Sequence, residues 1–577
     1  LTTMPSRTAS YNPTLTNQST LNKYRIDMKK RLICFAFAAL TIACMVGQRM
    51  PANLQKLLNA EYAINALYVD SVDEKKLVED AIVGMLEKLD PHSSFTTAKE
   101  TKELEEPLQG EFSGIGIQYN MKQDTLYVIQ TIVNGPSERV GILPGDRIIF
   151  VNDTTIAGVK LKNTDIQKKL RGKKGTKVTV KVKRGSNPEL ITFVITRDRI
   201  PLHSVDASYM LDSKTGYVKI SSFGAKTYKE MMDALKKLKK EGMKQLIIDL
   251  SDNGGGYMDA AIQMVNEFLD KDQMIVYTEG SNSPRNEAKA NGYGNFKDIK
   301  LVVMMSQYSA SASEIFAGAI QDWDRGLVIG RRSFGKGLVQ RPIKFEDGSM
   351  MRLTVARYHT PSGRCIQKPY TKGNKKGYDE DLLDRYNAGE YYNIDSIQFN
   401  DSLKYTSLVK KRTVYGGGGI MPDVFVPVDT TEYSKYYRDM LAKGVIYQFA
   451  LDYVDKHRAE LKANYKSVKD FDAKFHLTDA DMKDFIAAGE KEKVKYNEEQ
   501  YNISKNVFHT FLKGLICRDV FSDDSAYSII VSHSNKDLQE ALRLINDDAR
   551  YNTLLTTGNT EYEKIAAKHK AKAAQKK

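Results

Sequence analysis

The sequence predicts a multidomain α/β protein, and three observations support that prediction. The chain has 577 residues, enough for several domains. Residues 200–429 alternate short apolar runs with amphipathic stretches, as expected for buried strands and the helices that cover them. Residues 108–199 carry short alternating strands separated by glycine turns, whereas residues 52–105 and 430–577 show the spacing of helices.

The net charge of +14 raises the question of nucleic-acid binding. The lysines are spread along the whole chain and interleaved with acidic residues, as on solvated helix faces. We therefore expect no nucleic-acid partner. Much of the excess charge lies in helical stretches and in the final KIAAKHKAKAAQKK, which is expected to be a solvated tail.

The amino-terminal part of the chain predicts export. Residues 28–48 combine the basic Met28-Lys29-Lys30-Arg31 with an apolar run over 32–46, the pattern of a secretory signal peptide. We interpret the polar residues 1–27 as a segment upstream of the natural start. The protein is therefore expected in the periplasm or cell envelope. Membrane association through an uncleaved anchor and lipidation of Cys44 stay open.

Cysteine usage favours neither a disulfide nor a metal centre. After the signal, only Cys365 and Cys517 remain, far apart in the sequence, and we expect two free thiols. No cluster of cysteine and histidine has the spacing of metal ligands. We expect no metal ion and no other cofactor.

Residues 52–105 are expected to form an amino-terminal helical region. Apolar residues recur at helical spacing from Leu54 to Leu67, and a second helix is expected to run to Leu89. The residues Asp90-Pro91-His92 then end that helix. His92 is the residue here that suggests catalysis or metal binding, but we interpret it as a polar cap after the helix.

Residues 108–199 have the pattern of a small β domain with one helix. Strands are expected from Gly114-Ile115-Gly116-Ile117 onward, over 126–133, 148–151, 178–182 and 191–195, with a helix at 163–171. The glycine-rich entry leaves backbone N–H groups that can hold a carboxylate, and the adjoining strand edge can take a peptide as an added strand. A generic β-barrel with glycine turns is the alternative.

The core region contains a glycine loop after a buried strand. The strand at 245–250 runs into Ser251-Asp252-Asn253-Gly254-Gly255-Gly256, and a helix is expected from about Met258. A strand, a glycine turn and a helix also occur in phosphate-binding loops. Neither a G-x-G-x-x-G pattern nor a Walker lysine is present, so we exclude nucleotide binding.

A serine cluster and a lysine between glycines suggest acyl transfer. The apolar run 301–305 leads into Ser309-Ala310-Ser311-Ala312-Ser313-Glu314, which places these serines on a strand-to-helix turn. Further along lies Phe334-Gly335-Lys336-Gly337. A serine nucleophile needs a base, and a lysine can serve when it is uncharged. Alternatively, the serines only cap a helix and Lys336 is a surface lysine.

Together, SASASEIFAGAIQD and SFGKGLVQ resemble the carboxyl-terminal processing, or tail-specific, protease family of PDZ-bearing serine peptidases. The stretch FSGIGIQ…PSERVGILPGDRIIFVN is similar to a PDZ domain, and YVDSVDEKKL…GMLEKLDPHSSF is similar to the family's amino-terminal segment. The resemblance implies a PDZ domain at 108–199, a crotonase/ClpP-like α/β protease core at 200–429 and a helical carboxyl-terminal domain at 430–577.

The same resemblance implies roles for particular residues. Ser311 would be the nucleophile, Lys336 the general base and Gln340 the residue that orients the lysine. The N–H groups of Gly255 and Ala312 would form the oxyanion hole. In the PDZ domain, the substrate carboxyl terminus would be held by Gly114, Ile115, Gly116 and Ile117.

Several features lie outside these roles. Glu314, Asp322 and Ser333 are expected to support the site and not to react. Ser251 stands where the family usually has arginine, which leaves open how the glycine loop is held. Residues 368–418 interrupt the family pattern and are expected to form an inserted surface loop with little core.

The sequence thus predicts an exported serine endopeptidase with a Ser311–Lys336 dyad. Its substrates are expected to be proteins with exposed, apolar carboxyl-terminal tails. The alternative is an inactive PDZ adaptor that only binds such tails, and a histidine-based, tricorn-type relative is disfavoured by the serine and lysine motifs. Assembly into a homo-oligomer stays open.

Overall fold

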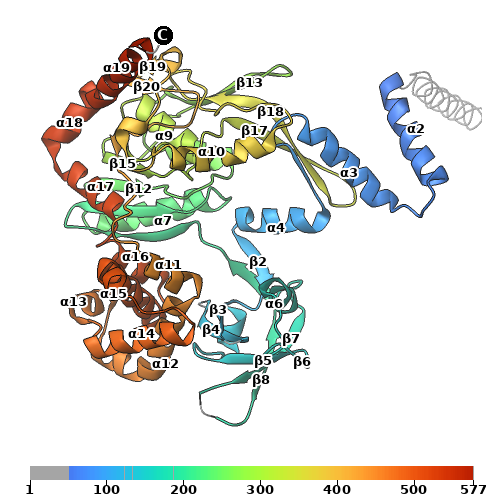
Figure 1. Ribbon diagram of the computed structural model, residues 1–577, viewed down its shortest axis with the longest axis vertical. Helices are drawn as coiled ribbons and strands as arrows, with labels where there is room; N and C mark the ends of the chain where they lie inside the picture. Colours follow the sequence, from blue (N-terminus) through green and yellow to red (C-terminus); the bar gives the residue numbers. More distant parts are fainter. Residues whose placement is uncertain (1–50, 123, 133, 186, 576–577) are drawn as a thin grey trace, which may run out of the picture. The chain divides into compact units, whose positions relative to one another are not determined.

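The computed structural model describes residues 51–575, apart from residues 123, 133 and 186 (Figure 1). The expected upstream segment 1–27 and signal peptide 28–48, with Cys44, lie outside these described residues. The chain divides into two compact units after Ile82. The first contains α2 (Ala52–Leu67), which buries none of its residues, and most of α3 (Glu74–Glu87).

The second unit begins with a short segment that leads to a β domain. This segment comprises β1 (Ser94–Thr96) and α4 (Ala98–Gln109), whose first turn is capped by Thr97 and Glu100. The elements of the β domain are β2 (Glu111–Gly114), β3 (Ile117–Lys122), β4 (Thr125–Thr131), α5 (Pro136–Arg139), β5 (Arg147–Val151), β6 (Thr154–Thr155), α6 (Asn163–Leu170), β7 (Lys177–Lys183), β8 (Ile191–Thr196) and β9 (Asp198–Pro201).

The sheet of this domain leaves β3 at an edge. Its strand order is β3-β4-β5-β7-β8, with β6 beside β5, and β2 pairs separately with β9. Within the described chain β3 pairs with β4 alone, so its other side is open to a further strand. Alternating apolar residues from β4, β5 and β7 form the core under α6.

The protease-like core is built on a second sheet of order β10-β11-β12-β15-β16-β21. All neighbours in it pair in parallel except β10 and β11. Its strands are β10 (Val205–Met210), β11 (Thr215–Ile220), β12 (Gln245–Asp249), β15 (Lys300–Met305), β16 (Leu327–Gly330) and β21 (Val424–Phe425). The predicted α/β class is therefore confirmed.

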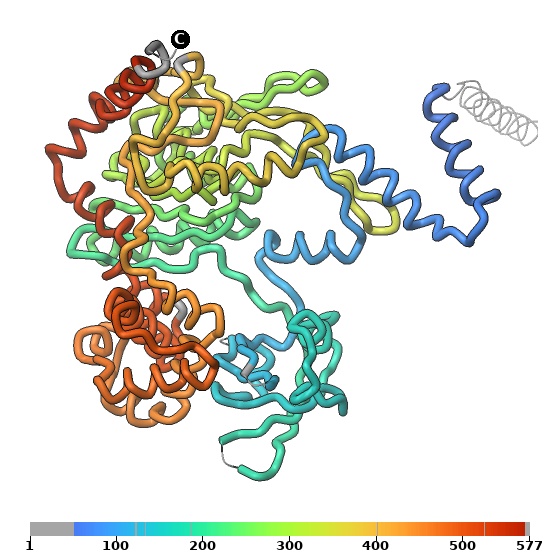
Figure 2. Tube along the Cα trace, viewed as in Figure 1, coloured from blue at the N-terminus to red at the C-terminus, as the bar shows by residue number. Residues whose placement is uncertain are grey.

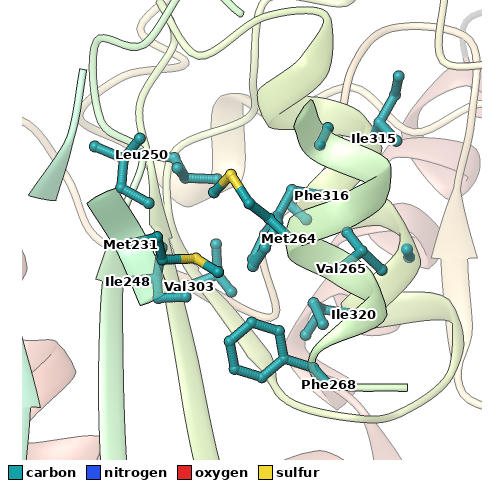
Figure 3. Close-up of a cluster of buried hydrophobic side chains, with 14 of the residues drawn as sticks. Met231, Ile248, Leu250, Met264, Val265, Phe268, Val303, Ile315, Phe316 and Ile320 are labelled. Atoms are coloured by element: carbon teal, nitrogen blue, oxygen red, sulfur yellow. The ribbon is translucent and has the colours of Figure 1, made fainter. Parts of the chain in front are cut away.

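Helices cover one face of this sheet and position the candidate site. They are α7 (Thr227–Lys240), α8 (Met258–Asn266) and α9 (Ala312–Asp322). Figure 3 shows Phe316 and Ile320 of α9 beside Met264 and Val265 of α8, facing Ile248 and Val303 of the sheet. Every residue of α9 is buried, so its amino terminus is held rigidly where the serine turn ends.

The opposite face of the sheet is covered by helices from the end of the chain. Leu538, Leu544 and Ile545 of α17 (Lys536–Asn546) and Tyr551 of α18 (Asp548–Thr557) pack on Ile247, Val302 and Met304. Figure 2 shows this red segment running along the core. Helices α17 and α18 of the expected helical carboxyl-terminal domain therefore pack against the core.

A third sheet adjoins the core and carries the segment that follows Lys336. Its order is β1-β18-β13-β14, and β17 pairs with β18. The strands are β13 (Met274–Gly280), β14 (Ser283–Lys289), β17 (Leu338–Lys344) and β18 (Met350–His359). Because β1 pairs with β18, the segment after α3 is tied to the same sheet as the lysine motif.

The prediction that residues 368–418 form a surface loop with little core is wrong. The segment contains α10 (Lys375–Asn387), the 3-10 turns η1 (Ile394–Ser396) and η2 (Asp401–Leu403), and the hairpin β19 (Lys404–Thr406) and β20 (Thr413–Tyr415). Tyr378, Arg385, Tyr391 and Ile397 are all buried. Tyr378, Tyr391 and Arg385 bury their rings and stem while their polar ends find partners.

The remaining helices form a separate bundle and a terminal arm. The bundle consists of α11 (Lys435–Ala442), α12 (Val445–Asn464), α13 (Val468–Lys474), α14 (Asp479–Lys491), α15 (Glu498–Phe521) and α16 (Asp524–Val531). The last helix is α19 (Thr560–Gln575), in which Tyr562 and Ile565 are buried. Tyr562, which packs on Ile397 and Met421, precedes the stretch expected to be solvated. Within that stretch Ile565 is buried, whereas Lys564, Ala567 and Lys568 are exposed.

Two further features bear on the sequence expectations. Cys365 and Cys517 are free thiols, and Cys517 is buried in the helical bundle. Over the described residues, no helix combines the length and the apolar character needed to cross a bilayer.

Candidate active site

The serine cluster occupies the turn between β15 and α9, and its three serines differ in their surroundings. Ser309 is fully buried, donates to Leu250 O at 2.7 Å and accepts from Ser306 N at 2.9 Å. Ser313 is also buried and donates to Asn253 O at 2.8 Å. Ser311 is half-exposed. The outer two hydroxyls therefore hold the turn, and the middle one is left for chemistry.

The backbone at Ser311 is strained in a way that suits an exposed nucleophile. Its φ of 57° and ψ of −113° lie in a region that residues with a Cβ rarely adopt. Such conformations cost roughly 1–3 kcal/mol and persist where the surroundings enforce them. Here the buried helix α9 follows directly, and Ala310 N donates to Asn253 O at 3.0 Å.

The Glu314 carboxylate joins the serine turn to the lysine loop. One oxygen, Oε2, accepts from Ser311 N at 2.7 Å and from Lys336 N at 2.9 Å. The other, Oε1, accepts from Ser333 Oγ at 2.6 Å and Gly335 N at 2.7 Å. Burial raises the pKa of the Glu314 carboxyl to about 7, although these hydrogen bonds oppose the rise.

A second bridge comes from Tyr358 on β18. Its buried hydroxyl lies 3.1 Å from Ser311 O and 2.6 Å from Lys336 O, within donating distance of both carbonyl oxygens. Ser311 and Lys336 are thus linked through both their N–H groups and their carbonyl groups. The structure brings together the two residues on which the sequence prediction depends.

The surroundings of Lys336 favour an uncharged amine. Burial lowers the pKa of the Lys336 amine, and the nearby Arg352 lowers it further, against the opposing charges of Glu314 and Asp90. No hydrogen bond or ion pair joins the Lys336 amine to any of the described residues, so it has neither a carboxylate partner nor a direct bond to Ser311. Catalytic hydrogen bonds are often longer before substrate binds.

The glycine loop approaches the serine turn as the oxyanion-hole prediction requires, but one donor is occupied. Gly255 has a φ of 99°, and a Cβ there would come within 2.8 Å of Ala310 O and of Ser311 Cβ. Gly255 N, however, donates to Asn253 Oδ1 at 2.8 Å. Ala312 N has no acceptor among the described residues, so it alone of the two predicted donors is available.

The strand end at Ser251 is held by contacts of the neighbouring Asp249. Ser251 N donates to Asp249 Oδ1 at 2.8 Å, while its hydroxyl is buried. Asp249 also accepts from Tyr217 Oη at 2.7 Å and forms an ion pair with Lys219 at 3.3 Å. Lys219 thus supplies a cation beside the strand end that precedes the glycine loop.

The supporting residues divide into those that reach the site and one that does not. Ser333 reaches it, because its hydroxyl donates to Glu314 and accepts from Ile420 N. Asp322 lies at the far end of α9, where it forms a fully buried ion pair with Arg364 at 2.7 Å and accepts from Ser362 N. The expectation that Asp322 supports Ser311 is therefore wrong; it fixes the loop after β18.

Gln340 belongs to a chain of polar contacts that sequence reasoning did not foresee. Its amide donates to Thr354 Oγ1 at 3.3 Å, and Thr354 Oγ1 donates to Asp90 Oδ1 at 2.9 Å. Asp90 also accepts from Ser93 Oγ. Among the described contacts Gln340 has none with Lys336, so the structure connects it to the segment after α3 instead.

His92 contacts the insertion in addition to lying after α3. Its Nε2 shares a hydrogen bond of 2.9 Å with Tyr378 Oη, and the two rings meet edge to face. Burial lowers the pKa of His92 to about 4, and the positive charge of Lys336 adds to that effect. The sequence signal was only the motif Asp90-Pro91-His92, whose partner Tyr378 lies in the insertion.

The expected peptide-binding loop precedes the edge strand β3. Gly116 has a φ of 73°, and Ile115 O accepts from Ser137 N and Ser137 Oγ, which fixes the loop against α5. The N–H groups of Ile115 and Gly116 have no acceptor in the described part of the chain. Gly114 ends β2 and Ile117 begins β3, so all four predicted residues lie together.

Beside β3 lies a groove of about 350 Å³ that the helical bundle helps to form. It is lined on one side by Tyr119 and Met121 of β3 and on the other by Tyr447, Gln448 and Leu451 of α12. Leu451 also packs on Tyr127 and Ile129 of β4. A groove with walls from two domains therefore lies beside the edge strand.

Comparison with protein families matches four parts of the chain. Residues 214–376 match Peptidase family S41, and residues 113–194 match a PDZ domain. Residues 39–101 match the activating protease CtpB N-terminal domain. Residues 436–523, which span the helical bundle from α11 to α15, match DUF8443, a family of unknown function.

Curated relatives are similar to more than half of the chain. A probable CtpA-like serine protease of Staphylococcus aureus (strain N315) is 37% identical over 361 residues, which cover 62% of this chain and 71% of the relative. The corresponding protein of Staphylococcus epidermidis (strain ATCC 12228 / FDA PCI 1200) is 36% identical over 323 residues, 56% of this chain and 65% of the relative.

Among solved structures, the photosystem II D1 C-terminal processing protease is 28% identical. The match covers 55% of this chain and 91% of that chain, with a TM-score of 0.32.

Proposed function

This chain belongs to peptidase family S41 and is a PDZ-containing serine protease of the C-terminal processing type, and from that premise we propose that it cleaves peptide bonds with Ser311 as nucleophile and Lys336 as general base. The observation that carries this proposal is the double bridge. Glu314 and Tyr358 hold Ser311 and Lys336 side by side, where burial favours the uncharged amine.

The reaction follows from these positions. The Ser311 hydroxyl oxygen attacks the peptide carbonyl carbon while the Lys336 amine takes the hydroxyl proton. The resulting ammonium gives that proton to the departing amine, and the carbon–nitrogen bond breaks to leave an ester on Ser311. Water then attacks the ester, Lys336 takes a proton from the water and returns it to Ser311, and the new carboxyl terminus is released.

The developing oxyanion takes its first hydrogen bond from Ala312 N, at the amino terminus of α9. Gly255 can give the second only after Asn253 Oδ1 releases its N–H. A donor of this kind is worth roughly 3 kcal/mol of the barrier. We infer that bound substrate draws the Gly255 N–H away from Asn253.

Substrate tails are proposed to bind in the PDZ domain. The N–H groups of Ile115 and Gly116 receive the terminal carboxylate, and the tail adds as a strand to β3. The preceding tail residues then lie in the groove shared with Tyr447, Gln448 and Leu451 of α12, where apolar tail residues would contact the Tyr447 ring and the Leu451 side chain.

The basic and apolar pattern of residues 28–48 supports export to the periplasm or cell envelope. Fractionation of cells that express the full chain checks this proposal: the protein is expected in the envelope fraction. A chain found only in the cytoplasm, with residues 28–48 intact, would contradict it.

The proposed chemistry is tested with a protein that carries an unfolded, apolar carboxyl-terminal tail. We expect the wild type to cleave it, and Ser311→Ala and Lys336→Ala to bind the tail without cleavage. Equal cleavage by all three proteins would exclude the dyad. Tail binding without cleavage by the wild type would instead indicate an adaptor.

A further inference from the structure

The loop that carries Lys336, residues 332–337, is held on two sides. On the α9 side, Glu314 accepts from three of its groups, and Phe334 N donates to Ser309 O at 3.0 Å. On the other side its partners belong to the segment that follows β18 and to the insertion. We name residues 332–337 the base loop.

Arg385 of α10 holds the first half of the base loop. Its guanidinium donates to Arg332 O at 2.7 Å and to Ser333 O at 3.1 Å. Only 5% of Arg385 is exposed, and its Nε donates to Glu390 Oε1 at 3.0 Å. Glu390 also accepts two hydrogen bonds from the Arg332 side chain, so Arg385, Glu390 and Arg332 form one buried ionic unit.

Tyr378 of α10 holds the second half. Its ring meets Phe334 edge to face at 5.9 Å, and its hydroxyl accepts from Gln367 Nε2 at 3.2 Å. The other amide atom of Gln367, Oε1, accepts from Gly337 N at 2.8 Å. The same Tyr378 hydroxyl contacts His92, so one side chain joins the insertion, the base loop and the segment after α3.

Lys368 contacts both the base loop and α10. Its ammonium lies 4.1 Å from the centre of the Phe334 ring and 4.0 Å from that of Tyr378, and its backbone N donates to Gly335 O at 2.9 Å. All these contacts go to the residues on either side of Lys336. None of them goes to the Lys336 amine itself, as far as the described chain shows.

We propose that α10 is a clamp on the base loop, and that Tyr378 and Arg385 are positioning residues for the hydrolysis. The proposal rests on the role of Lys336 as the base. It assigns to the insertion a part in setting where the amine lies and how well water is kept from it. The insertion is thus a component of the active site, although none of its residues is proposed to touch the substrate.

If the contacts of α10 with the base loop are weakened, the pH dependence of kcat is expected to change in a specific way. The charged or titratable groups around Lys336 are Arg352 and Tyr358 on β18, Glu314 on α9, Asp90 and His92 after α3, Tyr378 on α10 and Lys368. These stay in place in the variants below, apart from the lost hydroxyl of Tyr378. Water that reaches the amine raises its pKa, and each unit of rise lowers the uncharged fraction about tenfold at neutral pH.

The test compares Tyr378→Phe and Arg385→Gln with the control variants Tyr386→Phe and Lys376→Gln on the exposed side of the same helix. The substrate is a short peptide without a tail, assayed from neutral pH to about pH 10. We expect kcat to fall at least about tenfold at neutral pH in both clamp variants, with KM unchanged and activity recovered at alkaline pH. The controls should match the wild type.

Two outcomes separate this proposal from the one on which it rests. Wild-type kcat and pH profile in Tyr378→Phe and Arg385→Gln, while Lys336→Ala is inactive, would overturn the clamp and leave the dyad intact. Full activity in Lys336→Ala would overturn the dyad itself. An activity loss that alkaline pH does not reverse, with native thermal unfolding, would also contradict the clamp; should Arg385→Gln not fold, Tyr378→Phe alone decides.

Discussion

At the scale of single residues, the site depends on a carboxylate that never meets the substrate. Glu314 is fully buried and receives four hydrogen bonds, three from backbone N–H groups and one from a hydroxyl. A carboxylate can accept all four, whereas an amide brings two donors into the same space. The position of Lys336 relative to Ser311 therefore depends on the ionised form of Glu314.

We predict that Glu314→Gln lowers kcat about 100-fold, because the amide N–H groups face donors and separate the base loop from the serine turn. Glu346→Gln, on the exposed hairpin between β17 and β18, is the control. Since the pKa of Glu314 is about 7, wild-type kcat should also fall as the pH drops below neutral. Steady-state kinetics on a short peptide measures both effects, and a fully active Glu314→Gln would contradict them.

The buried Lys336 amine is expected to lower the free energy of unfolding of the protein. Its pKa is lower in the folded chain than the ordinary 10.5, so the unfolded chain binds more protons at this amine, and the contribution of Lys336 to stability rises with pH up to about that value. We predict that Lys336→Met unfolds at higher urea concentration than the wild type at neutral pH, and that the difference shrinks toward pH 10.5. The exposed Lys344→Met is the control, and a difference that grows with pH would be inconsistent with a buried, uncharged amine.

At the scale of elements, the strand β15 and the helix α9 could be predicted because their sequences are short, apolar and continuous. The same holds for β12 and the strands of the PDZ domain. The insertion could not, since α10 has almost no apolar periodicity and is held by buried ionic contacts such as Arg385 with Glu390. Those contacts join residues that sequence spacing does not relate.

The role of α17 was only partly predictable. Its apolar face is clear in the sequence, but the sheet face that it covers lies far away along the chain.

Within the site, the pairing of Ser311 with Lys336 could be predicted from the motifs. The contacts of Asp90, His92 and Tyr378 could not, because each residue type is common in turns and helices and only the tertiary fold brings them together.

We predict that Leu544→Ala in α17 lowers the free energy of unfolding by about 3 kcal/mol, because Leu544 is fully buried against the central sheet. Arg543→Ala, one residue earlier and exposed, should change it by less than about 0.5 kcal/mol. Urea unfolding measures both. Equal stability of the two variants would mean that α17 does not cover the sheet in solution.

At the scale of the whole chain, the PDZ domain and the helical bundle meet beside the open edge of β3. Leu451 packs on Tyr127 and Ile129, and Arg147 forms an ion pair with Asp455 at 3.4 Å. The bundle matches a family of unknown function, and its contact with the PDZ domain gives it a place next to the proposed tail groove. The proposed tail groove and the proposed catalytic residues thus lie in different parts of the chain.

This separation predicts a selective defect for Gly116→Val. A Cβ at Gly116 would lie 2.9 Å from Ile200 Cδ1 in a left-handed backbone conformation, so the loop before β3 must shift. We expect KM for a tailed protein to rise about tenfold or more while kcat/KM for a short peptide without a tail stays unchanged. Gly158→Val, at another left-handed glycine of the domain with open space around it, is the control. Equal losses on both substrates would argue against a separate tail site.

The central claim is that the uncharged amine of Lys336 activates Ser311 and neither neighbouring serine. The most direct measurement is acylation by a serine-reactive phosphonate or β-lactone, followed by peptide mapping that locates the label. The account predicts a label on Ser311 in the wild type, formed faster as pH rises, and almost none in Lys336→Ala at neutral pH. A label on Ser309 or Ser313, or equal labelling in Lys336→Ala, would contradict it.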